Sequence, residues 1–161
     1  MILCLAFASG CREKELISVP IFISRFNKIS DERVDKKNIC ALEDGDNLVY
    51  NFLLGENILL TLKSQKESGR IFQCTVTAQR EKALDEKKFF DICADVIRSY
   101  EKVDKDHTEN ILRSFSFKKG EASAKDGFYR IDFLANEAAV FFSVESSRLN
   151  SEKVTDNKLY E

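Results

Sequence analysis

The sequence predicts an α+β fold, in which an antiparallel sheet of about five strands carries helices on one face, in the order α-βββ-αα-ββ. Three observations lead to this prediction. Apolar residues recur at helical spacing in some segments and alternate with polar residues in others. Short turn sequences separate the alternating segments, which favours antiparallel neighbours. The chain has 161 residues, of which 43% are hydrophobic and 32% charged, as expected for one soluble domain with one core.

The first predicted element is a short amphipathic helix over 19–31. Ser18 and Pro20 are typical of a helix start, as a cap residue followed by a proline in the first turn. The inner face carries apolar residues at helical spacing, which are Val19, Phe22, Ile23, Phe26 and Ile29. Residues 31–47 are mostly polar and are predicted to form a connector.

Three strands are predicted next, over 48–54, 57–63 and 70–78. Gly55 and Gly69 lie in the turns that separate them. In the third strand, one face carries Phe72, Cys74, Val76 and Ala78, and the other carries Gln73, Thr75 and Thr77. This alternation is typical of a half-buried antiparallel strand.

Two helices follow the third strand. Asp85 is predicted to cap a helix that runs to about residue 103. Its inner stripe is Phe89, Cys93, Val96 and Tyr100. Asp106 and Glu109 have the spacing of a capping box, so a second helix is predicted to start there and to continue through Phe115.

The last part of the predicted domain contains two strands, over 128–134 and 138–146. Residues 120–127 are predicted to form a loop before them. The segment 147–161 is polar and is predicted to be a C-terminal tail. A single α+β domain is therefore expected over 19–146.

The first ten residues carry no charge and end in small side chains before a cysteine, in the order Ala8, Ser9, Gly10, Cys11. Charged residues begin at once with Arg12. This stretch resembles the lipobox of bacterial lipoprotein precursors, with Ala8 where that motif usually has Leu. The resemblance implies that 1–10 are a signal peptide, that Cys11 carries the lipid, and that 11–18 are a lipidated N-terminus and spacer.

The residue after the lipidated cysteine bears on location. In enteric-type bacteria an Asp there marks retention at the inner membrane, so Arg12 implies the outer membrane, with the domain facing the periplasm. The stretch lacks a basic start, so an in-frame extension upstream of Met1 that carries Lys or Arg is expected. The alternative is an apolar N-terminal strand in which Cys4 and Cys11 are ordinary buried cysteines.

Three cysteines lie further along the chain. Cys74 and Cys93 are both predicted to point inward from neighbouring elements, so they are a candidate disulfide in an exported protein. As reduced thiols they would be small buried hydrophobic residues. Cys40 lies in the predicted connector and could instead pair with either of them.

The sequence carries no motif for a cofactor, a metal or a catalytic centre. It has no C-x-x-C pair and one histidine, His107, which is predicted to be a solvated residue at a helix start. Residues 44–47 resemble a fragment of a calcium loop but lack its other ligands, so a hairpin turn is predicted there. The net charge is -2 without a basic stripe, which argues against binding to nucleic acid.

The function expected from these observations is that of a lipid-anchored bacterial envelope protein. Its domain would be a non-catalytic binding or structural module, attached to the membrane through the N-terminal lipid, with a protein partner of unknown identity. The alternative is a cytosolic protein similar to the acidic secretion chaperones. Those proteins also have a helix, three strands, a helix and two strands, and commonly dimerise.

Overall fold

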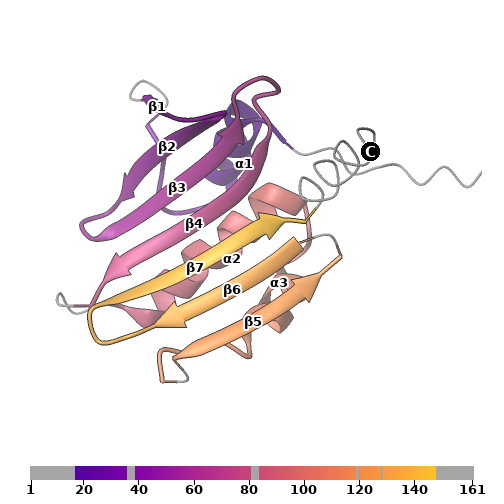
Figure 1. Cartoon of the computed structure of the whole chain (residues 1–161). Helices are drawn as coiled ribbons and strands as arrows, with labels where there is room; N and C mark the ends of the chain where they lie inside the picture. The colour runs from indigo at the N-terminus through magenta and orange to yellow at the C-terminus, as the bar shows by residue number, and fades with distance from the viewer. Residues whose placement is uncertain (1–16, 36–38, 81–83, 119, 128, 148–161) are drawn as a thin grey trace, which may run out of the picture.

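The computed structural model describes residues 17–35, 39–80, 84–118, 120–127 and 129–147. Within these ranges the chain forms three helices and one antiparallel sheet of seven strands. All three helices lie on the same face of the sheet, behind the strands in Figure 1. The predicted α+β class and the antiparallel pairing are confirmed, and the strand count is higher than predicted.

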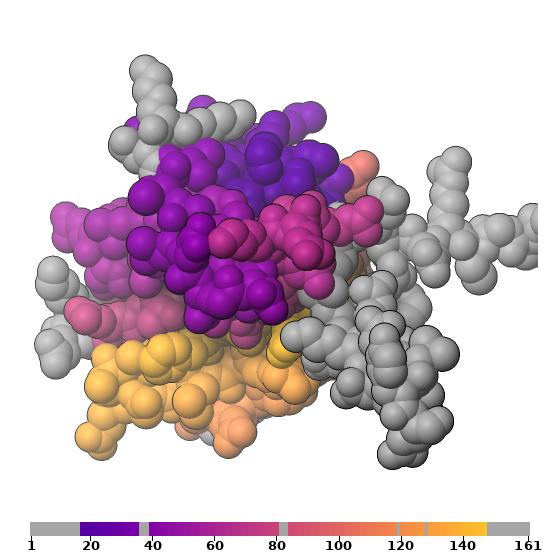
Figure 2. Space-filling view, turned by 45° about the horizontal axis from the view of Figure 1, so that its top comes forward, coloured from indigo at the N-terminus to yellow at the C-terminus, as the bar shows by residue number. Residues whose placement is uncertain are grey.

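The sheet consists of two meanders that meet at its centre. Its strand order is β1-β2-β3-β4-β7-β6-β5. The first meander comprises β1 (Ala41–Asp44), β2 (Asn47–Leu54), β3 (Ile58–Gln65) and β4 (Ile71–Gln79), and the second comprises β5 (Glu121–Asp126), β6 (Tyr129–Ala135) and β7 (Ala139–Ser146). The pairing of β4 with β7 joins them, from Gln73 opposite Glu145 to Gln79 opposite Ala139. In Figure 2 the purple-to-pink atoms of the first meander lie directly against the yellow and orange atoms of the second.

Two strands were missed by the sequence prediction, one at each edge of the sheet. Residues 31–47 contain β1 as well as a connector, and the predicted loop 120–127 contains β5. Each pairs on one side only, with β2 and β6 respectively. All four residues of β1 are exposed, and the inward positions of β5 include only alanines as apolar residues. Short, charged edge strands limit edge-to-edge aggregation, and they give no apolar alternation in the sequence.

The first helix, α1 (Val19–Ile29), confirms the predicted position of the helix start. Pro20 lies in the first turn, and Ser18 occupies the N-cap position without a side-chain hydrogen bond. Phe22, Ile23 and Phe26 are buried in the core. The backbone before the helix is tied to the sheet, because Ile71 N–H donates to the carbonyl of Ile17 at 2.9 Å.

The long helix, α2 (Glu86–Glu101), begins as predicted with Asp85, whose side chain accepts a hydrogen bond from Lys88 N–H. The predicted inner stripe is confirmed, since all four of its residues, Phe89, Cys93, Val96 and Tyr100, are buried. Tyr100 also donates its hydroxyl to the carbonyl of Ile71 at 2.8 Å, which links the end of α2 to the start of β4. Burial raises the pKa of this hydroxyl well above its usual value, so Tyr100 stays a donor.

The third helix, α3 (Lys105–Leu112), starts earlier than predicted. Its cap is Asp104, not Asp106, and the Asp104 side chain accepts a hydrogen bond from His107 N–H at 2.8 Å. Asp104 and Asp106 are both acidic residues that can cap a helix, and the structure places the cap at Asp104. Thr108 is fully buried and donates its hydroxyl to the carbonyl of Asp104. The helix ends before Phe115, which is buried against Phe133 of β6 with stacked rings.

We expect Phe89→Ala to lower the free energy of unfolding by about 3–5 kcal/mol, because it removes a fully buried ring and leaves a cavity. Lys87→Ala on the same helix is the control and should change it by less than about 0.5 kcal/mol. The Lys87 side chain is 84% exposed and pairs only with Asp91 on its own helix among the ion pairs of the described chain. Urea melts of both variants measure the difference, and equal effects would contradict the assigned orientation of α2.

Candidate functional site

The most distinctive surface of the protein is the sheet face opposite the helices. No helix among the described residues lies on it (Figure 1). Seven large hydrophobic side chains of the described chain are exposed, and five of them point outward from this face: Leu42, Leu53, Leu59, Leu134 and Phe141. Isolated exposed hydrophobic residues are common on protein surfaces, so what matters is how these side chains are arranged. We call this surface the outward face.

Four of the five hydrophobic side chains fall in one line across the strands. The register pairs Leu53 with Leu59, Leu59 with Thr77, Thr77 with Phe141, and Phe141 with Leu134. Residues paired in this way have Cβ atoms about 4.5–5.5 Å apart, so neighbouring side chains touch. Their exposed fractions range from 37% for Leu59 to 66% for Leu53. We call this line, which crosses five strands, the apolar row.

A second line, two residues along each strand, consists of small polar side chains. It contains Asn51, Thr61, Thr75, Ser143, Asp132 and Ser123. Thr61 Oγ1 donates to Asn51 Oδ1 at 2.8 Å, and Ser123 Oγ donates to Asp132 Oδ1 at the same distance. We call this line the hydroxyl row. This row makes the surface beside the apolar row polar, and Asp132 is its one charged residue.

A third line, two residues further along, carries most of the charge on the outward face. It contains Val49, Lys63, Gln73, Glu145, Arg130 and Lys125. Arg130 lies between two carboxylates, with Nη2 2.9 Å from Glu145 and Nε 2.7 Å from Asp132 of the hydroxyl row. These carboxylates raise the pKa of Arg130. We call this line the charged row.

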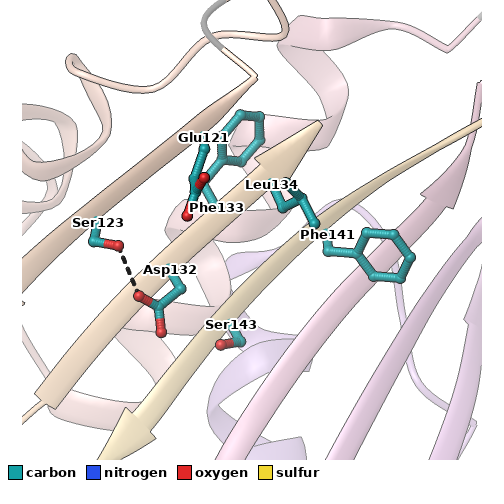
Figure 3. A pocket seen from close by; sticks show the side chains of 7 residues that line it. All are labelled: Glu121, Ser123, Asp132, Phe133, Leu134, Phe141 and Ser143. Atoms are coloured by element: carbon teal, nitrogen blue, oxygen red, sulfur yellow. Dashed lines mark hydrogen bonds between the residues drawn. The ribbon is translucent and has the colours of Figure 1, made fainter. Parts of the chain in front are cut away.

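A shallow hollow lies over β5, β6 and β7, where the apolar and hydroxyl rows meet (Figure 3). Its volume is about 400 Å³. It is lined by Glu121, Ser123, Asp132, Phe133, Leu134, Phe141 and Ser143. Figure 3 shows the hydrogen bond between Ser123 and Asp132 on one side of it and the apolar pair of Leu134 and Phe141 on the other. The hollow therefore has a polar side and an apolar side.

The sequence prediction assigned helices to one face of the sheet but did not identify the other face as a site. A signal for it was present. Leu53, Leu59, Leu134 and Phe141 are apolar at positions that the strand alternation assigns to the solvent side. Their alignment in one row depends on the register and on the pairing of β4 with β7, which the sequence does not specify.

The predicted lipid-attachment residue, Cys11, lies outside the described residues, as do the signal peptide 1–10, most of the spacer and the segment 148–161 of the tail. Cys74 on β4 and Cys93 on α2 are both fully buried, as predicted, and carry free thiols in this structure. Burial raises the pKa of both thiols, so neither is a reactive thiolate. Their pairing in an oxidising compartment stays a prediction. Cys40 is exposed beside β1.

His107 has a partner that the sequence did not predict. Its Nε2 lies 2.7 Å from Oδ2 of Asp126, at the end of β5, so the pair connects α3 to an edge strand. The predicted position at a helix start is confirmed, and the side chain is 45% exposed. The hydrogen bond and charge of Asp126 raise the pKa of His107 above its usual value of 6.5.

Acidic residues gather at a second hollow, between the end of α1 and the start of α2, which includes Asp31, Asp91 and Asp95. Lys87 and Lys88 lie among them, paired with Asp91 and with Glu32. Burial raises the pKa of Asp95, which disfavours its charged form. Within the described ranges, no group of three or more His, Cys, Asp and Glu side chains is arranged to hold a metal ion.

The predicted hairpin turn at 44–47 is confirmed. Gly45 lies in the tight connection between β1 and β2 with a φ of 59°, a conformation that favours glycine. The Asp44 and Asn47 backbones are paired across it. This segment is therefore part of the edge of the sheet.

No family model, curated protein or solved structure matches this chain. None of the three helices of the described chain is long and apolar enough to cross a membrane. Function is therefore inferred from the residues themselves.

We expect Asp126→Asn to lower the pKa of His107 towards 6.5, because the variant loses the carboxylate that stabilises the imidazolium. The folded-state pKa is raised, so the contribution of this pair to stability is present below about pH 6.5 and is lost as the pH rises through the raised pKa. NMR titration of the single histidine measures the shift. Asp106→Asn is the control, and equal shifts in both variants would contradict the assignment.

Proposed function

We propose that the protein is a lipid-anchored bacterial envelope protein whose domain is a non-catalytic binding module that faces the periplasm from the outer membrane. The observation that carries the binding proposal is the apolar row on the outward face. These hydrophobic side chains are 37% to 66% exposed, so they leave a large part of their apolar surface in water in the monomer. Covering them would remove apolar surface from water, and this favours association with a partner.

The anchoring proposal is supported by the residues from Ala8 to Cys11 and by the position of the domain's first described residues. Ile17 is hydrogen-bonded to Ile71 at the start of β4. The spacer 11–18 can reach about 25 Å when extended. A lipid on Cys11 would therefore hold the domain close to a membrane surface.

The alternative, a cytosolic protein similar to the secretion chaperones, has less support from the fold than from the sequence. That resemblance was based on three strands before the central helices and two after them. The structure has four strands before α2 and three after α3. The order of elements, which was the sole basis of the resemblance, therefore differs.

The mass of the intact protein from bacterial membranes tests the anchoring proposal. A lipoprotein should have lost residues 1–10 and gained the mass of several acyl chains at Cys11. An unprocessed chain that starts at Met1 and remains in the soluble fraction would contradict the proposal.

We expect Cys11→Ser to abolish labelling with a radioactive fatty acid and to release the protein from the membrane fraction, because the thiol that would accept the lipid is gone. Cys40→Ser is the matched control, since Cys40 is an exposed cysteine that lies outside the lipobox-like stretch. Fractionation and immunoblotting measure the release. Membrane association of Cys11→Ser equal to that of the control would show that the protein is held by something other than the lipid.

A further inference from the structure

We propose that the outward face binds the same face of a second copy of this chain, around a two-fold axis that runs along β4. The inference rests on the proposed binding function of this face and names its partner. It is drawn from the order of the strands and from the residues that each strand presents outward.

The strand order makes the sheet symmetric about β4. This strand is the fourth of seven, with three strands on each side. A two-fold rotation about an axis parallel to β4 places β4 over β4 of the second copy, β3 over β7, β2 over β6 and β1 over β5. Positions along the strands are kept by this rotation, so each row faces the same row of the second copy. Sheets stacked face to face with aligned strands are a common packing.

Residues on a two-fold axis face themselves, so a charged residue there would meet its own charge. The outward residues of β4 nearest the axis are Gln73, Thr75 and Thr77, and none is charged. Threonine hydroxyls and glutamine amides both donate and accept hydrogen bonds, so each can pair with an identical group. The centre of the sheet is therefore compatible with self-association.

The apolar row is complementary to itself under this rotation. Phe141 on β7 faces Leu59 on β3 of the second copy, and Leu134 on β6 faces Leu53 on β2. Each pairing occurs twice in the dimer. All four exposed hydrophobic side chains of the row are thus covered by hydrophobic side chains.

The charged row is also complementary to itself. Lys63 on β3 faces Glu145 on β7 of the second copy, which creates two opposite-charge pairs per dimer. Arg130 faces Val49, and in the hydroxyl row Asp132 faces the amide of Asn51. This rotation therefore brings no two like charges of these three rows directly opposite each other.

The size of the outward face fits the same arrangement. Strands about 4.8 Å apart with a rise of about 3.3 Å per residue give the sheet a face of roughly 800 Å², which is about what each partner contributes to a standard interface.

The position of the first described residues fits the same arrangement. Ile17 is hydrogen-bonded to Ile71 at the start of β4, next to the axis. The two lipidated N-termini would therefore leave the dimer at the same end and could enter one membrane, which raises the local concentration of the copies.

The proposed dimer is tested by reversing each charge of the intermolecular pair of Lys63 and Glu145 in turn. The full chain carrying Cys11→Ser serves as the parent, so that self-association is measured without the lipid. Lys63→Glu places a carboxylate opposite Glu145 of the second copy, and Glu145→Lys places an ammonium group opposite Lys63. Each variant should dimerise at least about tenfold more weakly than the parent in light scattering, because like charges meet twice. A one-to-one mixture should dimerise again, since both pairs then have opposite charges.

Two further variants test the apolar row and provide the matched control. Leu59→Asp should be monomeric, since it places a carboxylate opposite Phe141 of the second copy. Ile21→Asp introduces the same charge at an exposed hydrophobic residue of α1, behind the sheet, and should dimerise like the parent. Circular dichroism confirms that each variant is folded.

A parent that stays monomeric in light scattering would overturn the proposal and assign the outward face to another occupant. A dimer that Ile21→Asp disrupts as strongly as Leu59→Asp, or a charge-reversed mixture that stays monomeric, would overturn the proposed geometry. The proposed anchoring fails separately, in the lipid-labelling experiment on Cys11, because that measurement does not depend on self-association.

Discussion

The structure depends on the pairing of β4 with β7, because among the described strands this ladder alone joins the two meanders into one sheet. The paired residues are far apart in the sequence, and the chain between them forms α2 and α3, which cover the inner face of the sheet. Val76 pairs with Phe142 at this junction, and both side chains are fully buried. The ladder therefore brings together strands that α2, α3, β5 and β6 separate in the chain. Such long-range pairing is typical of slowly folding domains.

The sequence predicted the elements whose residues are periodic and buried. The alternation of Ile58, Leu60 and Leu62 and the helical stripe that contains Phe89 both report burial on one side, so the inner face could be predicted. β1 and β5 could not be predicted in this way, because they are held by backbone hydrogen bonds to one neighbour and bury little apolar surface. The start of α3 was predicted two residues late, because Asp104 and Asp106 are both suitable cap residues and the sequence pattern does not choose between them.

The candidate site was harder to predict than the fold for a related reason. The rows of the outward face join residues from both meanders, and their alignment follows from the register of five ladders. Leu59 and Phe141 are brought to the same row by Thr77, to which both are paired. Neither residue is unusual in its own segment, since single exposed hydrophobic side chains are common. The information lies in their combination, which requires the β4–β7 pairing that the sequence does not specify.

The inward residues of the sheet must form the core, whereas the outward residues do not. The outward residues are therefore the ones that bear on binding. An inward residue such as Val76 must be apolar for the core to form, whatever the protein does. An outward residue such as Leu53, at 66% exposure, adds little burial in the monomer, and a polar residue there would improve solubility. The proposed partner would cover leucine at such a position, next to the hydroxyl row and the charged row. The uncharged centre at β4, with hydrophobic and charged groups placed on either side of it, is the pattern that a two-fold symmetric partner requires.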